Sequence, residues 1–522
     1  MTANLRRLLS GLFALCLLLC LIPVQSAGAE GANEEAPIQA EDVSDFSLLV
    51  DSVGFEHRDT LFDRRVYSGY STYTDASSLT LEYAEGMGSL YLIFGDAYGS
   101  YTITDNTSGE SITCGKDGFI HEFVDLEGAF GFAPTSITME FANGRVKICE
   151  ISVYTTGEVP DSVQKWDHPV DDRTDLILFS THGDDEQLFF AGLLPYYAVE
   201  RGYQVQVVYL TDHTNKTGVR IHEMLNGLWA VGIRSYPIFG EYPDFYTKNG
   251  GEAQELFAYY GYTFDEMTGW LVEQLRRFKP QVIVGHDFNG EYGHGQHKVY
   301  AKLIAAAVEV SNDPSQYPES AEAYGVWDVP KTYIHLYKEN QIIMDWDQPM
   351  EKYDGMTPFE VSKNLGFYGC HLSQISNFSW WIRDYDTAAS VEVWNPSYYG
   401  LYRSTVGLDE KKNDFFENLT TYTEQDRIAV EEARRLEEER KQEEARLAAE
   451  EEARRQAEEA ERLAAEEAQR QEEARLKAEQ EAALAREAAR RQNLIIFLCA
   501  GSAVLVVLIV LILIIAFKKP KR

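Results

Sequence analysis

The segment from about residue 40 to 158 alternates apolar and polar positions, with glycine, aspartate and asparagine residues between the alternating runs. The clearest runs cover residues 79–83, 89–94, 136–141 and 145–154. Such alternation predicts short strands with one face in a core, because successive side chains of a strand point to opposite sides. Many short strands separated by turns predict a β-sandwich of the jelly-roll type.

From about residue 172 the hydrophobic pattern changes to strands that alternate with helices. Short apolar runs predict strands at residues 176–180, 204–210, 236–239 and 281–284. Apolar residues at helical spacing predict helices at residues 186–201, 220–231 and 264–278. This order predicts an α/β domain over residues 172–420, built on a Rossmann-like, mainly parallel sheet with right-handed crossovers.

Residues 424–492 consist almost entirely of Glu, Ala, Arg, Lys and Gln, all good helix formers, and contain no Pro or Gly. Several acidic residues precede a basic residue by four positions, as in Glu437 and Lys441, which is the favourable order on a helix. The few leucines keep no heptad period, and a coiled coil needs one. We therefore expect a solitary helical stalk of about 100 Å, with a disordered charged linker as the alternative.

Two further segments predict a membrane protein. Residues 494–517 form an apolar run long enough to span a bilayer, followed by a basic tail at 518–522. A buried core helix is the alternative for this run. Residues 1–29 have the charged start, apolar run and small-residue end of a secretory signal. The expected localisation is the cell membrane, with one span and the bulk of the chain outside the cytoplasm.

Length, charge and cysteine content restrict the function further. The 522 residues require several domains. The formal net charge of −36 argues against a nucleic-acid partner, because phosphate binding needs a basic face. Of the six cysteines, only Cys114, Cys149 and Cys370 lie outside the predicted signal and membrane segments. This is too few for a disulfide scaffold, and the spacing leaves open whether Cys114 and Cys149 pair.

The candidate chemistry lies where two predicted strands end. His182, Asp184 and Asp185 follow the strand at 176–180, and loops at the carboxyl ends of strands hold the ligands of open α/β sheets. A histidine and a carboxylate three residues apart can bind a metal ion, and the second carboxylate can then take a proton from water. The motif alone does not decide the chemistry, since acidic pairs after strands also bind Mg²⁺ or cap the next helix.

A second motif follows the strand at 281–284 and contains His286, Asp287, His294 and His297. A single histidine is most often an ordinary hydrogen-bonded residue. Histidines and aspartates gathered at two strand ends of one sheet instead favour a metal site. Two histidines and one carboxylate, with a free position for water, form a catalytic zinc set, although such a set also accepts Fe²⁺ or Co²⁺.

At these residues the chain resembles the PIG-L/LmbE-like family of zinc-dependent N-acetylglucosaminyl deacetylases. The family's opening motif, His-Pro-Asp-Asp-Glu, corresponds to His-Gly-Asp-Asp-Glu at residues 182–186. Its later His-x-x-His corresponds to His294 and His297, and an Arg-x-x-Glu pattern corresponds to Arg220 and Glu223. These motifs occur in the family's order and on the expected elements.

The resemblance covers residues 172–420 and implies Zn²⁺ as the cofactor. The implied metal ligands are His182, Asp185 and His297. It also implies that Asp184 is the general base and that His294 assists the tetrahedral intermediate and the departure of the amine. Substrate contacts are expected from Arg220, Asp244 and Asp287. The alternatives are an ion-pair partner for Arg220, a turn residue for Asp244, and a position behind the metal ligands for Asp244 and Asp287. Glu186 is expected behind the metal ligands or at the start of the helix.

We therefore expect an extracytoplasmic zinc hydrolase that removes N-acetyl groups from carbohydrate or amino-sugar substrates. Two alternatives remain: an amide hydrolase that acts on a non-sugar amide, and a non-catalytic carbohydrate-binding surface protein on a stalk. The β segment at 40–158 resembles galactose-binding-like modules, mainly through its closing strand at 145–154. That resemblance is compatible with carbohydrate binding and equally with an accessory structural role.

Overall fold

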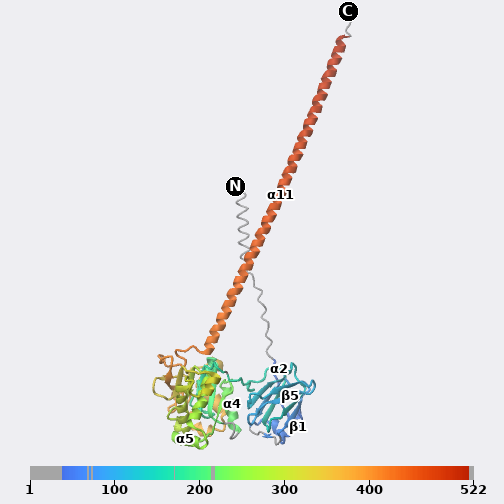
Figure 1. The fold of residues 1–522 in the computed structure, drawn as a ribbon. Helices are drawn as coiled ribbons and strands as arrows, with labels where there is room; N and C mark the ends of the chain where they lie inside the picture. Colours follow the sequence, from blue (N-terminus) through green and yellow to red (C-terminus); the bar gives the residue numbers. More distant parts are fainter. Residues whose placement is uncertain (1–37, 67–69, 72–74, 170, 213–217, 517–522) are drawn as a thin grey trace, which may run out of the picture. The chain divides into compact units, whose positions relative to one another are not determined.

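The computed structural model describes residues 38–66, 70–71, 75–169, 171–212 and 218–516 (Figure 1). The chain divides into two compact units, Met1–Asp426 and Arg427–Arg522. The predicted signal at 1–29 and the basic tail at 518–522 lie outside the described residues.

Two antiparallel sheets form the N-terminal part of the first unit. The five-stranded sheet has the order β1 (Leu49–Val53), β3 (Ser77–Glu82), β8 (Ser136–Phe141), β5 (Tyr101–Asp105), β6 (Ser111–Cys114). The four-stranded sheet has the order β2 (Tyr70–Ser71), β9 (Lys147–Tyr154), β4 (Ser89–Phe94), β7 (His121–Asp125), and the short helix α2 (Leu126–Phe130) follows β7. Alternate residues of β3 such as Leu79 and Leu81 are fully buried in one core with Leu90 and Leu92 of β4, as the alternating sequence predicts. Cys114 and Cys149 are not joined by a disulfide bond.

The α/β region contains a seven-stranded sheet. Its order is β12 (Ile238–Tyr242), β11 (Val205–Thr211), β10 (Leu176–Ser180), β13 (Val282–Gly285), β14 (Lys331–His335), β16 (Tyr398–Ser404), β15 (Gln341–Ile343). The first five strands of this order pair in parallel, and β16 pairs antiparallel to both of its neighbours. The mainly parallel sheet agrees with the alternation of strands and helices in the sequence.

Helices cover both faces of this sheet. Their bounds are α3 (Asp185–Leu188), α4 (Val219–Ala230), α5 (Gly250–Tyr259), α6 (Phe264–Phe278), α7 (Gly295–Val310), α8 (Pro318–Tyr324), α9 (Pro358–Glu360) and α10 (Ile375–Ile382). Leu176 and Leu178 of β10 share a core with α4, whereas Ile177 and Phe179 share a core with α6 and α7. All five residues of β10 are buried, because a central parallel strand has no solvent-facing side.

The predicted helix at 186–201 is wrong in its middle. Helix α3 ends at Leu188, and a separate π-helical turn, η3, covers Pro195–Glu200. Gly192 lies between them with φ of 95°, a conformation that side chains disfavour. Its missing Cβ also leaves room for Trp346, which would otherwise lie 2.6 Å away. Pro195 then starts the new turn, consistent with the preference of proline for the first helical position.

The strand order reverses next to β10, and this reversal places the candidate site. The chain runs from β10 outward through β11 to β12, then returns to add β13 on the other side of β10. Such a reversal leaves a crevice at the carboxyl ends of the two central strands. The loop at 181–184 and the start of α3 follow β10, and the loop at 286–294 follows β13, so both predicted motifs lie at this point.

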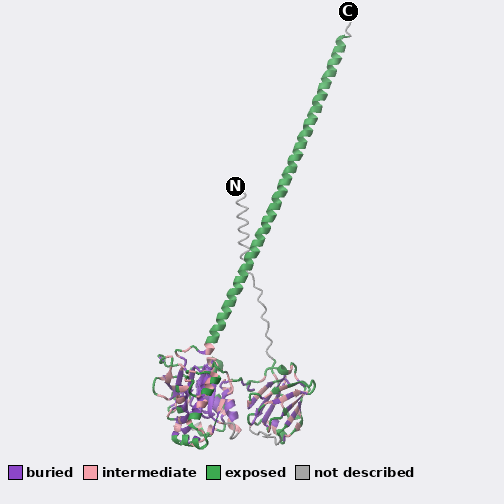
Figure 2. Ribbon diagram, viewed as in Figure 1, coloured by how far each residue is buried: buried purple, intermediate pink, exposed green. Residues whose placement is uncertain are grey.

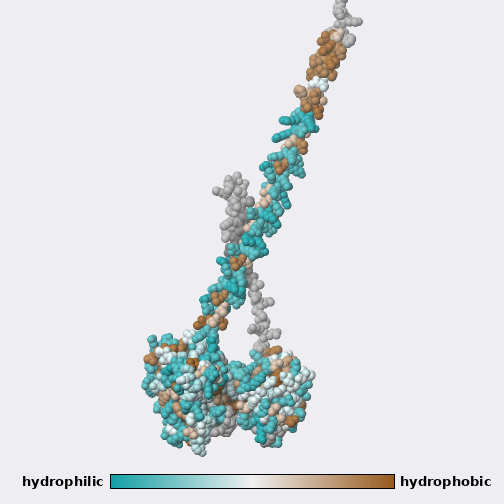
Figure 3. All heavy atoms as spheres, in the orientation of Figure 1, coloured by the Kyte–Doolittle hydropathy of each residue, from teal (hydrophilic) through white to brown (hydrophobic). Residues whose placement is uncertain are grey.

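The second unit belongs to one continuous helix, α11 (Tyr422–Ala516). Its polar part carries exposed ion pairs such as Lys441 with Glu437 at 2.8 Å, and exposed pairs of this kind contribute about 0.3–0.5 kcal/mol each. No residue of α11 is buried, as Figure 2 shows. The last turns are strongly apolar, coloured brown in Figure 3, and are long enough to cross a membrane. The predicted stalk at 424–492 and the predicted span at 494–517 therefore form one helix, which the structure describes up to Ala516.

Candidate active site

The loop after β10 presents one imidazole and one carboxylate to each other. The backbone N–H of His182 donates to Asp185 Oδ2 at 2.9 Å, and His182 Nδ1 lies 3.2 Å from the same oxygen. The other nitrogen, Nε2, lies 3.0 Å from Gln296 Oε1. That amide oxygen also accepts from the backbone of Phe245, which fixes it as an acceptor. His182 therefore donates through Nε2–H and turns the lone pair of Nδ1 toward Asp185.

The third group comes from the start of α7. His297 Nε2 lies 3.2 Å from Asp185 Oδ2 and 3.2 Å from His182 Nδ1. The other nitrogen of His297, Nδ1, lies 2.7 Å from Glu291 Oε2. A carboxylate on one imidazole nitrogen holds the proton there and directs the lone pair of the other nitrogen outward, as in many zinc proteins. His182, Asp185 and His297 are all buried.

These three atoms have the spacing of a metal's ligands. His182 Nδ1, Asp185 Oδ2 and His297 Nε2 form a triangle with 3.2 Å sides. Tetrahedral zinc with bonds of about 2.0–2.2 Å separates its ligand atoms by about 3.4 Å. Two imidazole lone pairs that face each other at this distance repel unless a proton or a metal ion lies between them. The residues present therefore fit a divalent metal ion.

The Asp185 carboxyl supplies an independent sign of a missing partner. Its Oδ1 is buried and has no hydrogen-bond partner among the described residues, which is uncommon for a buried carboxylate. Burial alone would raise the pKa of Asp185, but the charges of His297 and His182 outweigh burial and hold that pKa well below its usual range. Asp185 is thus an ionised, incompletely paired ligand candidate.

His286 belongs to the same cluster but does not offer a free lone pair. It groups with Asp185 and His297 by distance. However, its Nε2 accepts from the backbone N–H of Thr181 at 3.0 Å, and its Nδ1 lies 2.8 Å from Glu291 Oε2. Both nitrogens are therefore occupied, and we assign His286 to the support of the cluster.

His294 has the geometry of a hydrogen-bond donor. Its Nδ1 accepts from the backbone N–H of Gln296 at 3.2 Å and caps α7, so the proton of the neutral ring is on Nε2. Burial and the neighbouring His182 lower the pKa of His294 far below its ordinary value. The ring centroid lies 4.7 Å from those of His182 and His297. His294 also groups with these two residues by distance.

The carboxylate of Asp184 is paired with Arg220. Arg220 Nη2 donates to Asp184 Oδ2 at 3.2 Å, and Arg220 Nη1 lies 3.8 Å from Glu223. Glu223 in turn accepts from the backbone N–H and the hydroxyl of Ser373. Burial, opposed by the charge of Arg220, raises the pKa of the Asp184 carboxyl. A buried carboxyl with a raised pKa is suited to accept and return a proton.

The remaining predicted residues have different positions. Asp244 Oδ1 lies 3.6 Å from His182 Nε2, and its side chain is 44% exposed, so it lies at the open side of the cluster. Asp287 instead accepts from the backbone and side-chain amides of Asn289. Glu186 lies 3.5 Å from His371, and burial raises the pKa of Glu186 to about 8.

Glu291 and His335 were not predicted from the sequence. Glu291 accepts from three imidazoles, those of His286, His297 and His335, and from the backbone N–H of Asp287. Burial would raise the pKa of Glu291, but His286 and the hydrogen bonds hold it well below its usual range. His335 is the last residue of β14. A search for histidines at the ends of strands, which found His182 and His286, would also have found His335.

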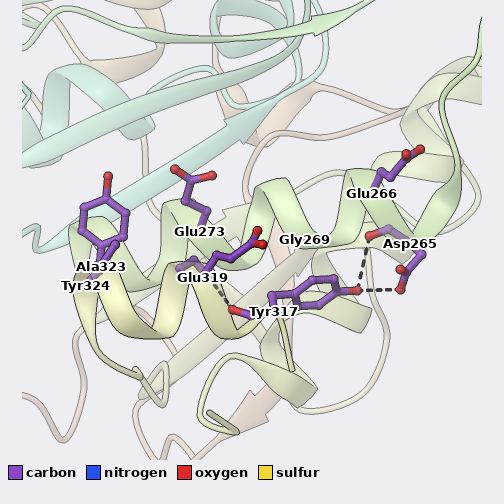
Figure 4. A pocket seen from close by; sticks show the side chains of 9 residues that line it. Asp265, Glu266, Gly269, Glu273, Tyr317, Glu319, Ala323 and Tyr324 are labelled. Carbon is purple, nitrogen blue, oxygen red and sulfur yellow. Dashed lines mark hydrogen bonds between the residues drawn. The ribbon is translucent and has the colours of Figure 1, made fainter. Parts of the chain in front are cut away.

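A separate hollow lies between α6 and α8, away from the predicted site residues (Figure 4). It has a cavity volume of about 440 Å³, and Asp265, Glu273, Tyr317 and Glu319 are among its lining residues. Tyr317 donates to Asp265 across it. None of its lining residues belongs to the histidine cluster.

Comparison with known proteins identifies the segment that carries the cluster. Residues 177–308 match the family model described as PIG-L: GlcNAc-PI de-N-acetylase. This segment is a PIG-L family domain. His182, Asp185 and His297 all lie inside the PIG-L domain. A Cβ at Gly183, where the family motif has proline, would lie 2.1 Å from Met224, so Met224 fills the space that a proline ring would need.

Curated relatives of the PIG-L domain are deacetylases. 1D-myo-inositol 2-acetamido-2-deoxy-alpha-D-glucopyranoside deacetylase 1 of Catenulispora acidiphila is 28% identical over 179 residues, covering 30% of this chain and 54% of that protein. The deacetylase of Mycobacterium leprae strain Br4923 is 31% identical over 186 residues, covering 31% and 59%. The chain thus spans little more than half the length of these relatives.

Among solved structures, the N,N'-diacetylchitobiose deacetylase from Pyrococcus horikoshii matches 44% of this chain and 83% of its own length. The identity is 15% and the TM-score is 0.29. The resemblance of residues 40–158 to galactose-binding-like modules and the domain bounds stay predictions.

Proposed function

We propose that the chain is a zinc-dependent hydrolase that removes N-acetyl groups from amino-sugar-containing substrates. The observation that carries this proposal is the triangle of His182 Nδ1, Asp185 Oδ2 and His297 Nε2 with its 3.2 Å sides. The PIG-L match and the names of the curated relatives support the reaction. When bound there, zinc would polarise the acetamide carbonyl and make water a nucleophile at neutral pH.

Asp184 is the proposed general base. It takes a proton from the attacking water, while Arg220 holds its carboxylate by the 3.2 Å hydrogen bond. The raised pKa of Asp184 favours the return of this proton to the leaving nitrogen. The products are then acetate and a free amine.

His294 is the proposed donor to the reacting oxygen. Its Nε2–H, fixed by the bond from Gln296 to Nδ1, can donate to the carbonyl oxygen as negative charge develops there. Because burial keeps the ring neutral, we assign protonation of the leaving amine to Asp184 and not to His294. Asp244 and the Nη1 group of Arg220 are the proposed contacts to the sugar.

We also propose where the reaction occurs. The apolar end of α11 can span a membrane by its length and composition. Together with the signal predicted at 1–29 and the basic tail at 518–522, this favours one span with the PIG-L domain outside the cytoplasm. Glycans of a cell surface are then the substrates within reach.

Acetate release by the purified full-length protein tests the proposal. A panel of N-acetylglucosamine-containing oligosaccharides and non-sugar acetamides separates the sugar deacetylase from a general amide hydrolase. Asp184→Asn should lower turnover by about 10²–10⁴-fold and leave bound zinc unchanged. Asp313→Asn makes the same chemical change in the loop after α7 and should have no effect. A zinc-loaded wild type that releases no acetate from any member of the panel contradicts the proposal.

A further inference from the structure

A cavity of the β region lies outside everything described above. It has a volume of about 280 Å³ and lies on the outer face of the four-stranded sheet. Tyr91 of β4 and Glu150 and Tyr154 of β9 form its floor, and Asp42 and Arg64 are at its rim. All of these residues lie outside the PIG-L domain.

Glu150 places a buried carboxyl oxygen without a hydrogen-bond partner in this cavity. The side chain is only 4% exposed, and its Oε2 is buried without a hydrogen-bond partner. Burial raises the pKa of Glu150 to about 7, although hydrogen bonds from the backbone of Arg64 and Arg65 lower it. A carboxyl oxygen in such a place costs stability unless a donor or a cation satisfies it.

The charges around the cavity favour a cationic ligand. Arg64 pairs with Asp42 at 3.2 Å, and both lie on the exposed rim, so these two charges offset each other. Glu150 lies on the floor of the cavity. Among the described residues, no basic side chain comes close enough to Glu150 to form an ion pair. The rings of Tyr91 and Tyr154 give this floor flat, amphipathic surfaces of the kind that pack against a sugar ring.

We propose that this cavity binds the free amino group of an amino sugar, with Glu150 as the counter-ion. The volume suits one sugar ring. The choice of an amino sugar rests on the proposed function, because deacetylation turns an uncharged acetamide into an ammonium group. The β region would then hold the chain on glycans that its PIG-L domain has already deacetylated, and would bind the acetylated form weakly.

Calorimetric titration of the full-length protein in detergent with glucosamine at pH 7 tests this proposal. Glu150→Gln keeps the side-chain volume and removes the charge. We expect the number of glucosamine molecules bound per chain to drop by one, through at least about ten-fold weaker binding at this site. Glu140→Gln, on the exposed face of β8, is the matched control and should bind like the wild type. N-acetylglucosamine should not fill the site.

Ser162→Trp provides a second variant, because Ser162 is an exposed lining residue whose replacement closes the cavity without changing a buried group. It should remove the same binding event. Equal glucosamine binding in the wild type, Glu150→Gln and Ser162→Trp overturns the proposal, as does equally tight binding of N-acetylglucosamine at the site.

Acetate release, measured on the same preparations, separates the two proposals. If Glu150→Gln loses glucosamine binding but the wild type releases no acetate, the amine site is supported and the deacetylase is refuted. Acetate release with unchanged glucosamine binding in Glu150→Gln does the reverse.

Discussion

Two groups of buried histidines in the described part of the first unit differ in the carboxylates beside them. His182 and His297 face Asp185, and Glu291 supports His297 from behind. The other pair joins the β region to α4: His121 Nε2 lies 2.8 Å from His222 Nδ1. Around that second pair are the hydroxyl of Tyr91 and the thiol of Cys149, and no carboxylate among the described residues forms an ion pair with either ring.

This difference decides the charge that each group can hold. The charge of Asp185, and the hydrogen bonds that Asp185 and Glu291 accept from His297, raise the pKa of His297 to about 10 against the effect of burial. Burial lowers the pKa of His222 to about 4 and that of His121 well below its ordinary value. Negative charge therefore makes one cluster a place for a cation, whereas the other remains a neutral hydrogen-bonded contact. Burial of histidines alone would not distinguish them.

The largest expected effect comes from the carboxylate at the centre of the first cluster. Asp185→Asn keeps the shape but removes the charge that faces both imidazoles. Zinc affinity and turnover should both fall by more than about 10–100-fold, which is the loss expected when a residue that only supports a metal ligand is replaced. Metal analysis and acetate release check this. Full zinc content in this variant would show that the ion binds elsewhere.

Removal of the supporting carboxylate should have a smaller effect. Glu291→Gln removes the negative charge beside His286, His297 and His335. Metal affinity should therefore fall by about 10–100-fold. Competition with a chelator measures the affinity. Glu309→Gln, on the exposed side of α7, is the control. An unchanged metal affinity in Glu291→Gln would mean that Glu291 contributes to packing and not to metal binding.

The second histidine group should respond in stability and not in metal content. His222→Gln disturbs the bond to His121, and the unfolding free energy at pH 7 should fall by about 1–3 kcal/mol with zinc content unchanged. In the wild type, stability should also fall as pH drops from about 6.5 towards about 4, because His222 gains a proton only when unfolded. Thermal unfolding across that pH range should show a weaker dependence in His222→Gln. Loss of zinc in this variant would erase the distinction between the two groups.

The smallest expected effect is a shift in the pH profile. Arg220 lowers the pKa of Asp184 against the effect of burial. Because the base acts only when deprotonated, activity is lost as pH falls through this pKa. Arg220→Gln should raise the pKa of Asp184 and move the acid limb of kcat/KM to higher pH. Arg234→Gln, on the same side of the sheet but stacked on Trp229, should leave the limb in place. An acid limb that moves to lower pH contradicts the assignment of the base.

The sequence predicts the framework well where local signals are strong. Helix α6 has the predicted bounds because Thr263 and Glu266 form a capping box at its start, and the strand ends bring His182 and His297 together. Helix 186–201 fails because the break at Gly192 depends on Trp346, which is distant in sequence. Glu291 has no periodic pattern around it, and its partners come from separate elements. Tertiary contacts of this kind are not encoded in local spacing.

Zinc-edge X-ray absorption of the purified full-length protein tests the central claim most directly. The account predicts a zinc ion with two imidazole nitrogens and carboxylate or water oxygens at about 2.0–2.2 Å, and the loss of this spectrum in Asp185→Asn. Three imidazole ligands would place the ion among His182, His294 and His297 instead, and an active protein without bound metal would contradict the account as a whole.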